Sequence, residues 1–170
     1  YAADVNETRA YGSAASAVRT AAQTENARFA TEPPPRYWPR NLRQFAASNR
    51  SLAENARLMA MIWVAHADAI IGCFESKYFY EFWRPASAIA LADSDSNPGT
   101  VADPAWTPVV PTPNHPEYPA AHSCTTAAAA GILKTHFGTD KVSFSFDSAV
   151  AGTVVHSYRS TDDAVADTTA

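Results

Sequence analysis

The segment 51–83 limits the fold more than any other part of the chain; it reads SLAENARLMAMIWVAHADAIIGCFESKYFYEFW. Ser51 and Glu54 have the spacing of a capping box, and apolar residues then recur at helical intervals. From Leu58 to Phe74 apolar side chains lie nearly all round the helix, which is typical of a helix at the centre of a bundle. The sequence therefore predicts an all-α fold, a helical bundle packed around this helix.

The segment 92–118 predicts a long loop, because it holds six prolines together with Asp, Asn and Gly. Loops of this length inside compact domains are commonly functional. A second helix is expected to begin at Pro119, since proline is favoured at the first helical position, and to end at Gly138. After it, KVSFSFDS at 141–148 alternates apolar and polar residues, so we expect at most one short strand.

Residues 1–50 are expected to form an N-terminal helical segment. Ala and charged residues favour two or three modest helices within 2–30, and EPPPRYWPR at 32–40 then interrupts them as a hinge or wrapping segment outside the core. With 170 residues, of which 46% are hydrophobic and 18% charged, the chain is one domain or part of one. Residues 51–170 are then a partial helical core that lacks the end of its domain.

Charge and hydropathy exclude two classes of partner. The net charge of −4 and the lack of any Lys/Arg run longer than a dipeptide argue against nucleic acid. The longest apolar run, LMAMIWVA at 58–65, stops at His66, so we expect a soluble protein without a membrane span. Its compartment stays open, with secreted and periplasmic locations both compatible. Cys73 and Cys124 lie in apolar, helical settings and are expected to be buried thiols.

The stretch KYFYEFWRP places Lys77 and Arg84 seven residues apart. On one helix they would lie on nearly the same face, two turns apart, and could converge on one anion. The alternative is that both cations sit in water near a helix end, where they favour the helix dipole. The aromatic residues around them argue against that alternative, because a cation embedded in aromatic surface is partly desolvated and needs a counter-charge.

The stretch PEYPAAHS at 116–123 places His122 in the first turn of the second helix. A helix N-terminus presents free N–H groups and a positive partial charge, which makes it a ready site for an anion. The dipole favours the neutral form of a histidine there until an anion arrives, and this suits proton transfer near neutral pH. The alternative is a histidine that only packs or caps.

Together the two stretches resemble the signature of the vanadium-dependent haloperoxidases and the type 2 phosphatidic acid phosphatases. That signature is K-x6-R-P, then P-S-G-H after a variable loop, then S-R-x5-H-x3-D. KYFYEFWRP matches the first part at every fixed position, and PAAH matches the second at Pro119 and His122. The surrounding FWRPASAIALADSDSNPGTVADPAWTPVVPTPNHPEYPAAHS is similar to the soluble, haloperoxidase-related branch, and the resemblance covers residues 55–137 best.

The resemblance implies the helical-bundle fold of the haloperoxidases and acid phosphatases, with one oxyanion site. Lys77 and Arg84 would bind the equatorial oxygens of vanadate, the implied cofactor, or of phosphate, and Ala121 would offer its backbone N–H. His122 would be the acid–base residue, protonating bound peroxide in a haloperoxidase or the leaving group in a phosphatase. Three neighbours would lie just behind the anion contacts: His115, Ala120 and Ser123.

Two departures from the signature bear on the chemistry. Ala120 stands where the family has Ser, and the lost hydroxyl donor is worth about 1.5–3 kcal/mol if it bonds a charged oxygen. The third motif, which supplies a second arginine and the histidine that ligates vanadium or attacks phosphorus, does not occur. SYRSTDDAVAD at 157–167 has Arg159, but Val165 lies where the histidine should fall. We therefore expect the chain to end just before that motif, and we identify no metal-ligating residue in it.

Three hypotheses for the function remain open. The leading one is a vanadate-dependent haloperoxidase-like protein that oxidises halide with hydrogen peroxide. The second is a phosphoester hydrolase of the same superfamily, and the third is an inactive anion-binding or structural fragment. A partner chain in a homo-oligomer is a further source of the missing arginine and histidine. Small anions are the expected partners, namely halide, peroxide and phosphate ester.

Overall fold

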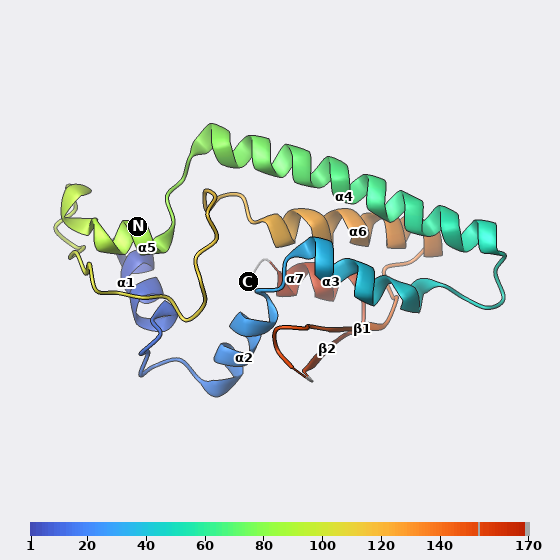
Figure 1. The fold of residues 1–170 in the computed structure, drawn as a ribbon, viewed down its shortest axis with the longest axis horizontal. Helices are drawn as coiled ribbons and strands as arrows, with labels where there is room; N and C mark the ends of the chain where they lie inside the picture. The colour runs from blue at the N-terminus through green and yellow to red at the C-terminus, as the bar shows by residue number, and fades with distance from the viewer. Residues whose placement is uncertain (153, 169–170) are drawn as a thin grey trace. The chain divides into compact units, whose positions relative to one another are not determined.

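The structure, a computed structural model, describes residues 1–152 and 154–168. Its helices are α1 (Ala2–Gly12), α2 (Ala21–Phe29), α3 (Pro34–Asn41), α4 (Leu52–Tyr80), α5 (Pro85–Ala90), α6 (Ala121–Phe137) and α7 (Thr161–Asp167). Two 3-10 turns, η1 (Leu42–Phe45) and η2 (Ala92–Ser94), and two strands, β1 (Phe144–Asp147) and β2 (Val155–Tyr158), complete the described elements (Figure 1). The all-α fold class is confirmed.

The chain divides into two compact units. The first unit holds Tyr1–Thr31 and Lys77–Tyr118, and the second unit holds Glu32–Ser76 and Pro119–Ala170. The division passes through α4, between Ser76 and Lys77, so the last turn of this helix belongs to the first unit. The division at residue 50 that we expected from the sequence remains a prediction.

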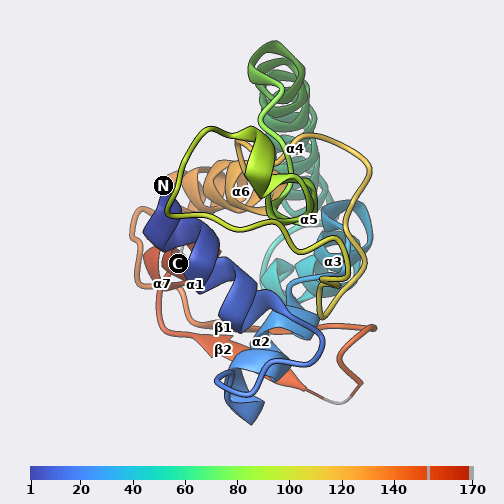
Figure 2. The ribbon, with the colours of Figure 1, turned by 90° about the vertical axis from the view of Figure 1, so that its left-hand side faces the viewer.

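In the first unit α1 packs against α5, as Figures 1 and 2 show. Several hydrogen bonds hold the proline-rich loop to α1, including one from the Val109 N–H to the Gly12 carbonyl at 2.9 Å. Asn6 Nδ2 donates to the Gly99 carbonyl at 3.0 Å, and Arg9 Nη1 donates to the Val101 carbonyl at 3.2 Å. In the reverse direction Trp106 Nε1 donates to the Arg9 carbonyl at 2.9 Å. Polar groups of α1 therefore satisfy loop carbonyls that no helix or sheet could pair.

In the second unit α4 and α6 lie side by side, and their inward faces form the core. Leu58 and Ile62 of α4 and Leu133 of α6 have no exposed surface. Between the helices, His66 Nε2 pairs with the Thr125 carbonyl at 3.0 Å. The Cys73 thiol is buried, as expected, and donates to the Pro119 carbonyl at 3.7 Å. Cys124 is also a free thiol, but it is partly exposed, so the expected burial was wrong for this residue.

The proline-rich stretch at 32–40 is a core element, and our expectation of a wrapping segment was wrong. It forms α3, with prolines at its first positions, where the missing N–H would have no intrahelical partner in any case. Trp38 is 1% exposed and contacts the Phe146 ring of β1, with ring centroids 4.9 Å apart. Burial of these aromatic side chains outweighs the helix-breaking tendency of Pro39.

The strands form an antiparallel hairpin in which Phe144 pairs with Tyr158 and Phe146 with His156. The sequence predicts at most one short strand, and the structure has two. The first strand could be predicted from the sequence because its buried residues, Phe144 and Phe146, alternate with exposed ones. The second buries only Tyr158, so it lacks the alternation from which a strand is predicted.

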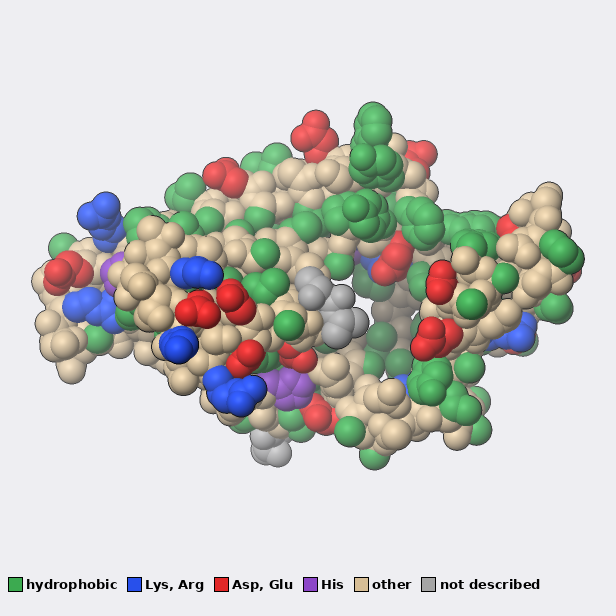
Figure 3. Space-filling model, turned by 180° about the vertical axis from the view of Figure 1, so that it is seen from behind, with side chains coloured by type: hydrophobic (Ala, Val, Ile, Leu, Met, Phe, Trp, Pro, Cys, Tyr) green, Lys and Arg blue, Asp and Glu red, His purple; other side chains and the backbone are tan. Residues whose placement is uncertain are grey.

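Among the described residues, one helical stretch, Leu52–Ala90, is long and apolar enough to cross a membrane by length and composition. Much of α4 is uncovered, and Figure 3 shows hydrophobic side chains gathered along the upper edge, where this helix lies. Val64, Ile71 and Phe79 are exposed at 62%, 66% and 79%. A helix of a water-soluble protein can have the same length and composition, so the expected lack of a membrane span stays a prediction.

Candidate oxyanion site

The break between α4 and α5 places the two cations of the first motif. Helix α4 ends at Tyr80, Glu81 follows in the left-handed region with φ of 47°, and Pro85 begins α5. Arg84 is extended, with φ of −73° and ψ of 152°, as expected for a residue that precedes proline. Lys77 and Arg84 therefore do not share one helix face, and that part of the argument from spacing was wrong.

Both cations nevertheless contact the same loop segment, residues 115–117. Lys77 is 1% exposed, and its Nζ donates to the carbonyls of Pro116 at 2.8 Å and Glu117 at 2.9 Å. Arg84 Nε donates to the His115 carbonyl at 2.7 Å. The loop thus brings together two cations from either side of a helix break.

Arg84 also meets two side chains of this segment. Its Nη1 donates to the Glu117 carboxylate at 2.6 Å, and its Nη2 lies 2.9 Å from His115 Nδ1. His115 Nδ1 also lies 3.1 Å from the Pro116 carbonyl, so it faces both a donor, the guanidinium, and an acceptor, the carbonyl. The pKa of His115 is lowered, first by burial and then by the nearby charges of Arg84 and Lys77, which agrees with a neutral ring.

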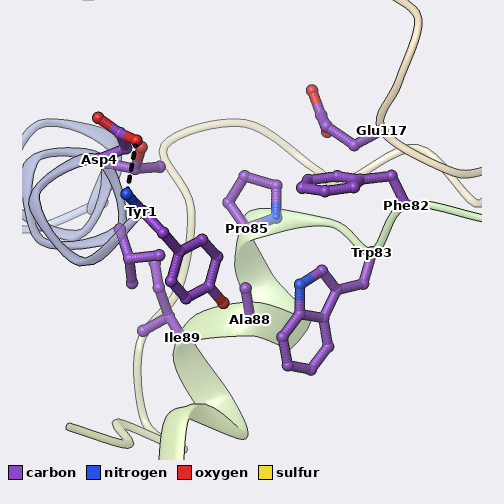
Figure 4. A pocket seen from close by; sticks show the side chains of 10 residues that line it. Tyr1, Asp4, Phe82, Trp83, Pro85, Ala88, Ile89 and Glu117 are labelled. Carbon is purple, nitrogen blue, oxygen red and sulfur yellow. Dashed lines mark ion pairs between the residues drawn. The ribbon is translucent and has the colours of Figure 1, made fainter. Parts of the chain in front are cut away.

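Two cavities of the first unit adjoin this cluster. An open cavity of about 430 Å³ is lined by Arg84, His115 and the loop residues 112–116, together with Glu81. A second cavity of about 180 Å³ is mainly apolar. Figure 4 shows the side chains of Phe82, Trp83 and Pro85 around it, with Glu117 beside Phe82. Phe82 and Trp83 line both cavities, so they form the wall between them.

The second motif lies at the N-terminus of α6. The helix begins at Ala121 with Ala120 as its N-cap, so Pro119 lies one residue before the cap and not at the first helical position. In the part of the chain that the structure describes, no side chain caps this end. The first-turn N–H groups have no intrahelical acceptors, so they are available donors for an anion.

His122 and Ser123 both contact segments outside α6. His122 Nε2 lies 2.9 Å from the Glu32 carbonyl, which can only accept, so Nε2 carries the proton and Nδ1 the lone pair. Ser123 Oγ donates to the Thr168 carbonyl after α7. Glu32 is itself buried, and Arg40 Nη1 donates to its Oε1 at 2.6 Å, which lowers the pKa of Glu32. The carbonyl that orients His122 thus belongs to an anchored residue.

The structure brings the expected site residues together in two groups. Lys77, Arg84 and His115 meet in the first unit, and the N-terminal turn of α6 lies in the second unit; its residues are Ala120, Ala121, His122 and Ser123. Glu117 was not among the site residues predicted from the sequence. The feature that could have indicated it is its position in PEY at 116–118, directly before the second motif.

The third motif has no structural counterpart in residues 1–152 and 154–168. No group of three or more His, Cys, Asp or Glu side chains in these residues could hold a metal ion. Val165, at the place of the expected histidine, lies in α7, and the Arg159 side chain is 95% exposed.

Comparisons with known proteins agree with the motifs. Residues 57–168 match the family of the VCPO second helical-bundle domain. A crystal structure described as the first bacterial vanadium-dependent iodoperoxidase is similar with a TM-score of 0.58 and 33% sequence identity; the match covers 71% of this chain and 27% of that one. No curated protein matches significantly. The chain therefore belongs to the family of the VCPO second helical-bundle domain, within the vanadium haloperoxidase superfamily.

Proposed function

We propose that this chain carries part of the oxyanion site of a vanadate-dependent haloperoxidase, which oxidises halide with hydrogen peroxide. The observation that carries the proposal is the family match over residues 57–168, because it spans both oxyanion motifs. The chain covers only 27% of the similar iodoperoxidase, so the reaction is proposed for a form that also contains the third motif.

The residues of the first unit suit an oxyanion such as vanadate. Arg84 already holds an anionic oxygen, that of Glu117, at 2.6 Å, and its terminal nitrogens each carry a second N–H. The buried Lys77 ammonium adds a second positive charge against the same loop segment. Vanadate, when bound, supplies the Lewis acid that activates peroxide towards attack by halide.

His122 is proposed to move the proton in this reaction. The Glu32 carbonyl accepts from Nε2, so Nδ1 is the atom that takes up and returns a proton. The same arrangement would serve a phosphoester hydrolase, in which Nδ1 protonates the leaving group.

We propose that the substrates of this activity are small anions in aqueous solution. Halide, peroxide and phosphate esters are the partners we propose, and a homo-oligomer in which a second copy supplies the missing arginine and histidine stays part of the proposal.

The test compares this 170-residue protein with a form extended to include the third motif. We expect vanadate-dependent oxidation of bromide or iodide by peroxide only in the extended form, and little hydrolysis of p-nitrophenyl phosphate. In that form His122→Ala should abolish turnover and leave vanadate binding largely intact, whereas Arg84→Ala should weaken binding first. Hydrolysis without peroxidase activity would favour the phosphatase, and no activity in either form would favour an anion-binding or structural fragment.

A further inference from the structure

We propose that the Glu117 carboxylate is an internal counter-anion, which occupies Arg84 in place of an oxyanion and is displaced when an oxyanion binds. This inference rests on the proposed function, because it concerns the same anion site. It assigns Glu117 a role in setting the affinity of that site.

The bond from Arg84 to Glu117 differs in kind from the other contacts of the cation pair. Lys77 and Arg84 Nε donate to backbone carbonyls, which fix the positions of the cations and leave their charges in place. Glu117 instead brings a full negative charge to Nη1 at 2.6 Å. A carboxylate and an oxyanion offer the same kind of acceptor to a guanidinium, so they compete for the same edge.

Exposure makes the carboxylate the movable partner. The Arg84 side chain is 17% exposed and is held at Nε by the His115 carbonyl, whereas the Glu117 side chain is 40% exposed. A partly exposed ion pair contributes little net stability, and water solvates the Glu117 carboxylate when the pair opens. Glu117 can therefore turn towards solvent at small cost, while Arg84 stays in place.

The backbone of Glu117 is anchored independently of its side chain. Its N–H donates to the Phe82 carbonyl at 2.8 Å, and its own carbonyl accepts from Lys77 Nζ at 2.9 Å. Release of the carboxylate therefore leaves the loop and Lys77 in place. This separates the proposed role from a structural one, since a variant that changes only the side-chain charge keeps both backbone bonds.

The test measures binding of orthovanadate and of inorganic phosphate to the full chain by calorimetry, with no turnover required. Glu117→Gln keeps the size of the side chain and removes its charge, so affinity should rise about three- to tenfold. Glu117→Asp shortens the reach to Arg84 and should give a smaller gain. Glu81→Gln is the matched control, because Glu81 lines the open cavity beside Arg84, and it should change affinity little.

Each outcome decides a different question. Unchanged or weaker binding by Glu117→Gln, while Arg84→Ala abolishes binding, would overturn the counter-anion and leave the proposed function standing. An equal gain in affinity in Glu81→Gln would also overturn it, since the gain would then come from the lower negative charge of the protein as a whole. Stronger binding in Glu117→Gln without peroxidase activity in the extended form would support the inference and count against the proposed function. Failure of the unchanged chain and of every variant to bind orthovanadate or phosphate would overturn the counter-anion, and the activity of the extended form would then decide the proposed function separately.

Discussion

His66 lies between two tryptophans in the second unit. Its ring centroid is 4.9 Å from that of Trp38 and 5.6 Å from that of Trp63, and the residue is 5% exposed. Burial lowers the pKa of His66, and its bond to the Thr125 carbonyl only partly opposes this. The ring is thus held neutral, because an imidazolium would lose its hydration without gaining a counter-charge.

This burial predicts a loss of stability at mildly acidic pH. Because the folded-state pKa is lowered, the unfolded chain takes up a proton at higher pH than the folded chain does. The contribution of His66 is full above its ordinary pKa of 6.5 and is lost as pH falls from there towards the folded-state value. The free energy of unfolding, measured with urea between about pH 7 and pH 5, should therefore fall as pH falls. The slope should approach about 1.4 kcal/mol per pH unit where His66 is protonated in the unfolded chain and neutral in the folded one.

His66→Gln, which keeps a donor for the Thr125 carbonyl, should flatten this pH dependence. His115 has a pKa lowered in the same direction, so His115→Gln is needed to measure its separate share. Carboxylates such as Glu32, whose pKa lies below its ordinary 4.5, lose their stabilisation only at lower pH. An unchanged slope in His66→Gln would show that another group titrates.

At the scale of elements, α6 has a well-defined end and an uncapped start. Gly138 follows its last turn with φ of 68°, a conformation that glycine adopts without the steric cost of a Cβ. At the other end Ala120 occupies the N-cap position, where the described residues provide no capping side chain. The signature that the chain resembles has Ser at this place, and a serine side chain here could supply the cap that Ala120 does not.

Ala120→Ser should therefore stabilise the protein. A serine at the N-cap accepts a hydrogen bond from a first-turn N–H and is worth about 0.5–2 kcal/mol. For a chain of this size that corresponds to a rise in Tm of about 2–4 °C per kcal/mol, which calorimetry can measure. Ala120→Val is the matched control, because valine caps no better than alanine. A Tm that rose equally in both variants would exclude capping as the cause.

Local sequence patterns predicted the elements that do not depend on contacts with distant parts of the chain. The helical spacing of apolar residues predicted the long helix α4, and the glycine at 138 predicted the end of α6. The prolines of 92–118 predicted the loop before α6. Helix α3 was not predicted, because it depends on the burial of Trp38 in the folded core. Strand β2 was not predicted, because it depends on pairing with β1. Within the candidate site, motif spacing identified Lys77 and Arg84, but only the folded loop places Glu117 on the guanidinium.

At the scale of the molecule, each unit has its own stabilising contacts. In the first, α1 holds the proline-rich loop through hydrogen bonds such as that of Asn6 with Gly99. In the second, α6 packs against α7, and Leu133 of α6 is buried together with Leu58 and Ile62 of α4. The chain passes from one unit to the other at 31–32, 76–77 and 118–119, and we expect damage to one unit to affect the other weakly.

Leu133→Ala tests this independence, because Leu133 has no exposed surface and belongs to the second unit. Truncation of a fully buried leucine costs about 2–5 kcal/mol. Hydrogen exchange followed by mass spectrometry should show faster exchange over 121–137 and 161–167, with much smaller changes over 1–31 and 84–118. The neighbouring Lys134→Ala is the control, since its exposed pair with Asp162, 3.7 Å apart, contributes little. Equal loss of protection in both units would show instead that the chain unfolds as one cooperative structure, in which the anion-binding loop depends directly on the core around α6.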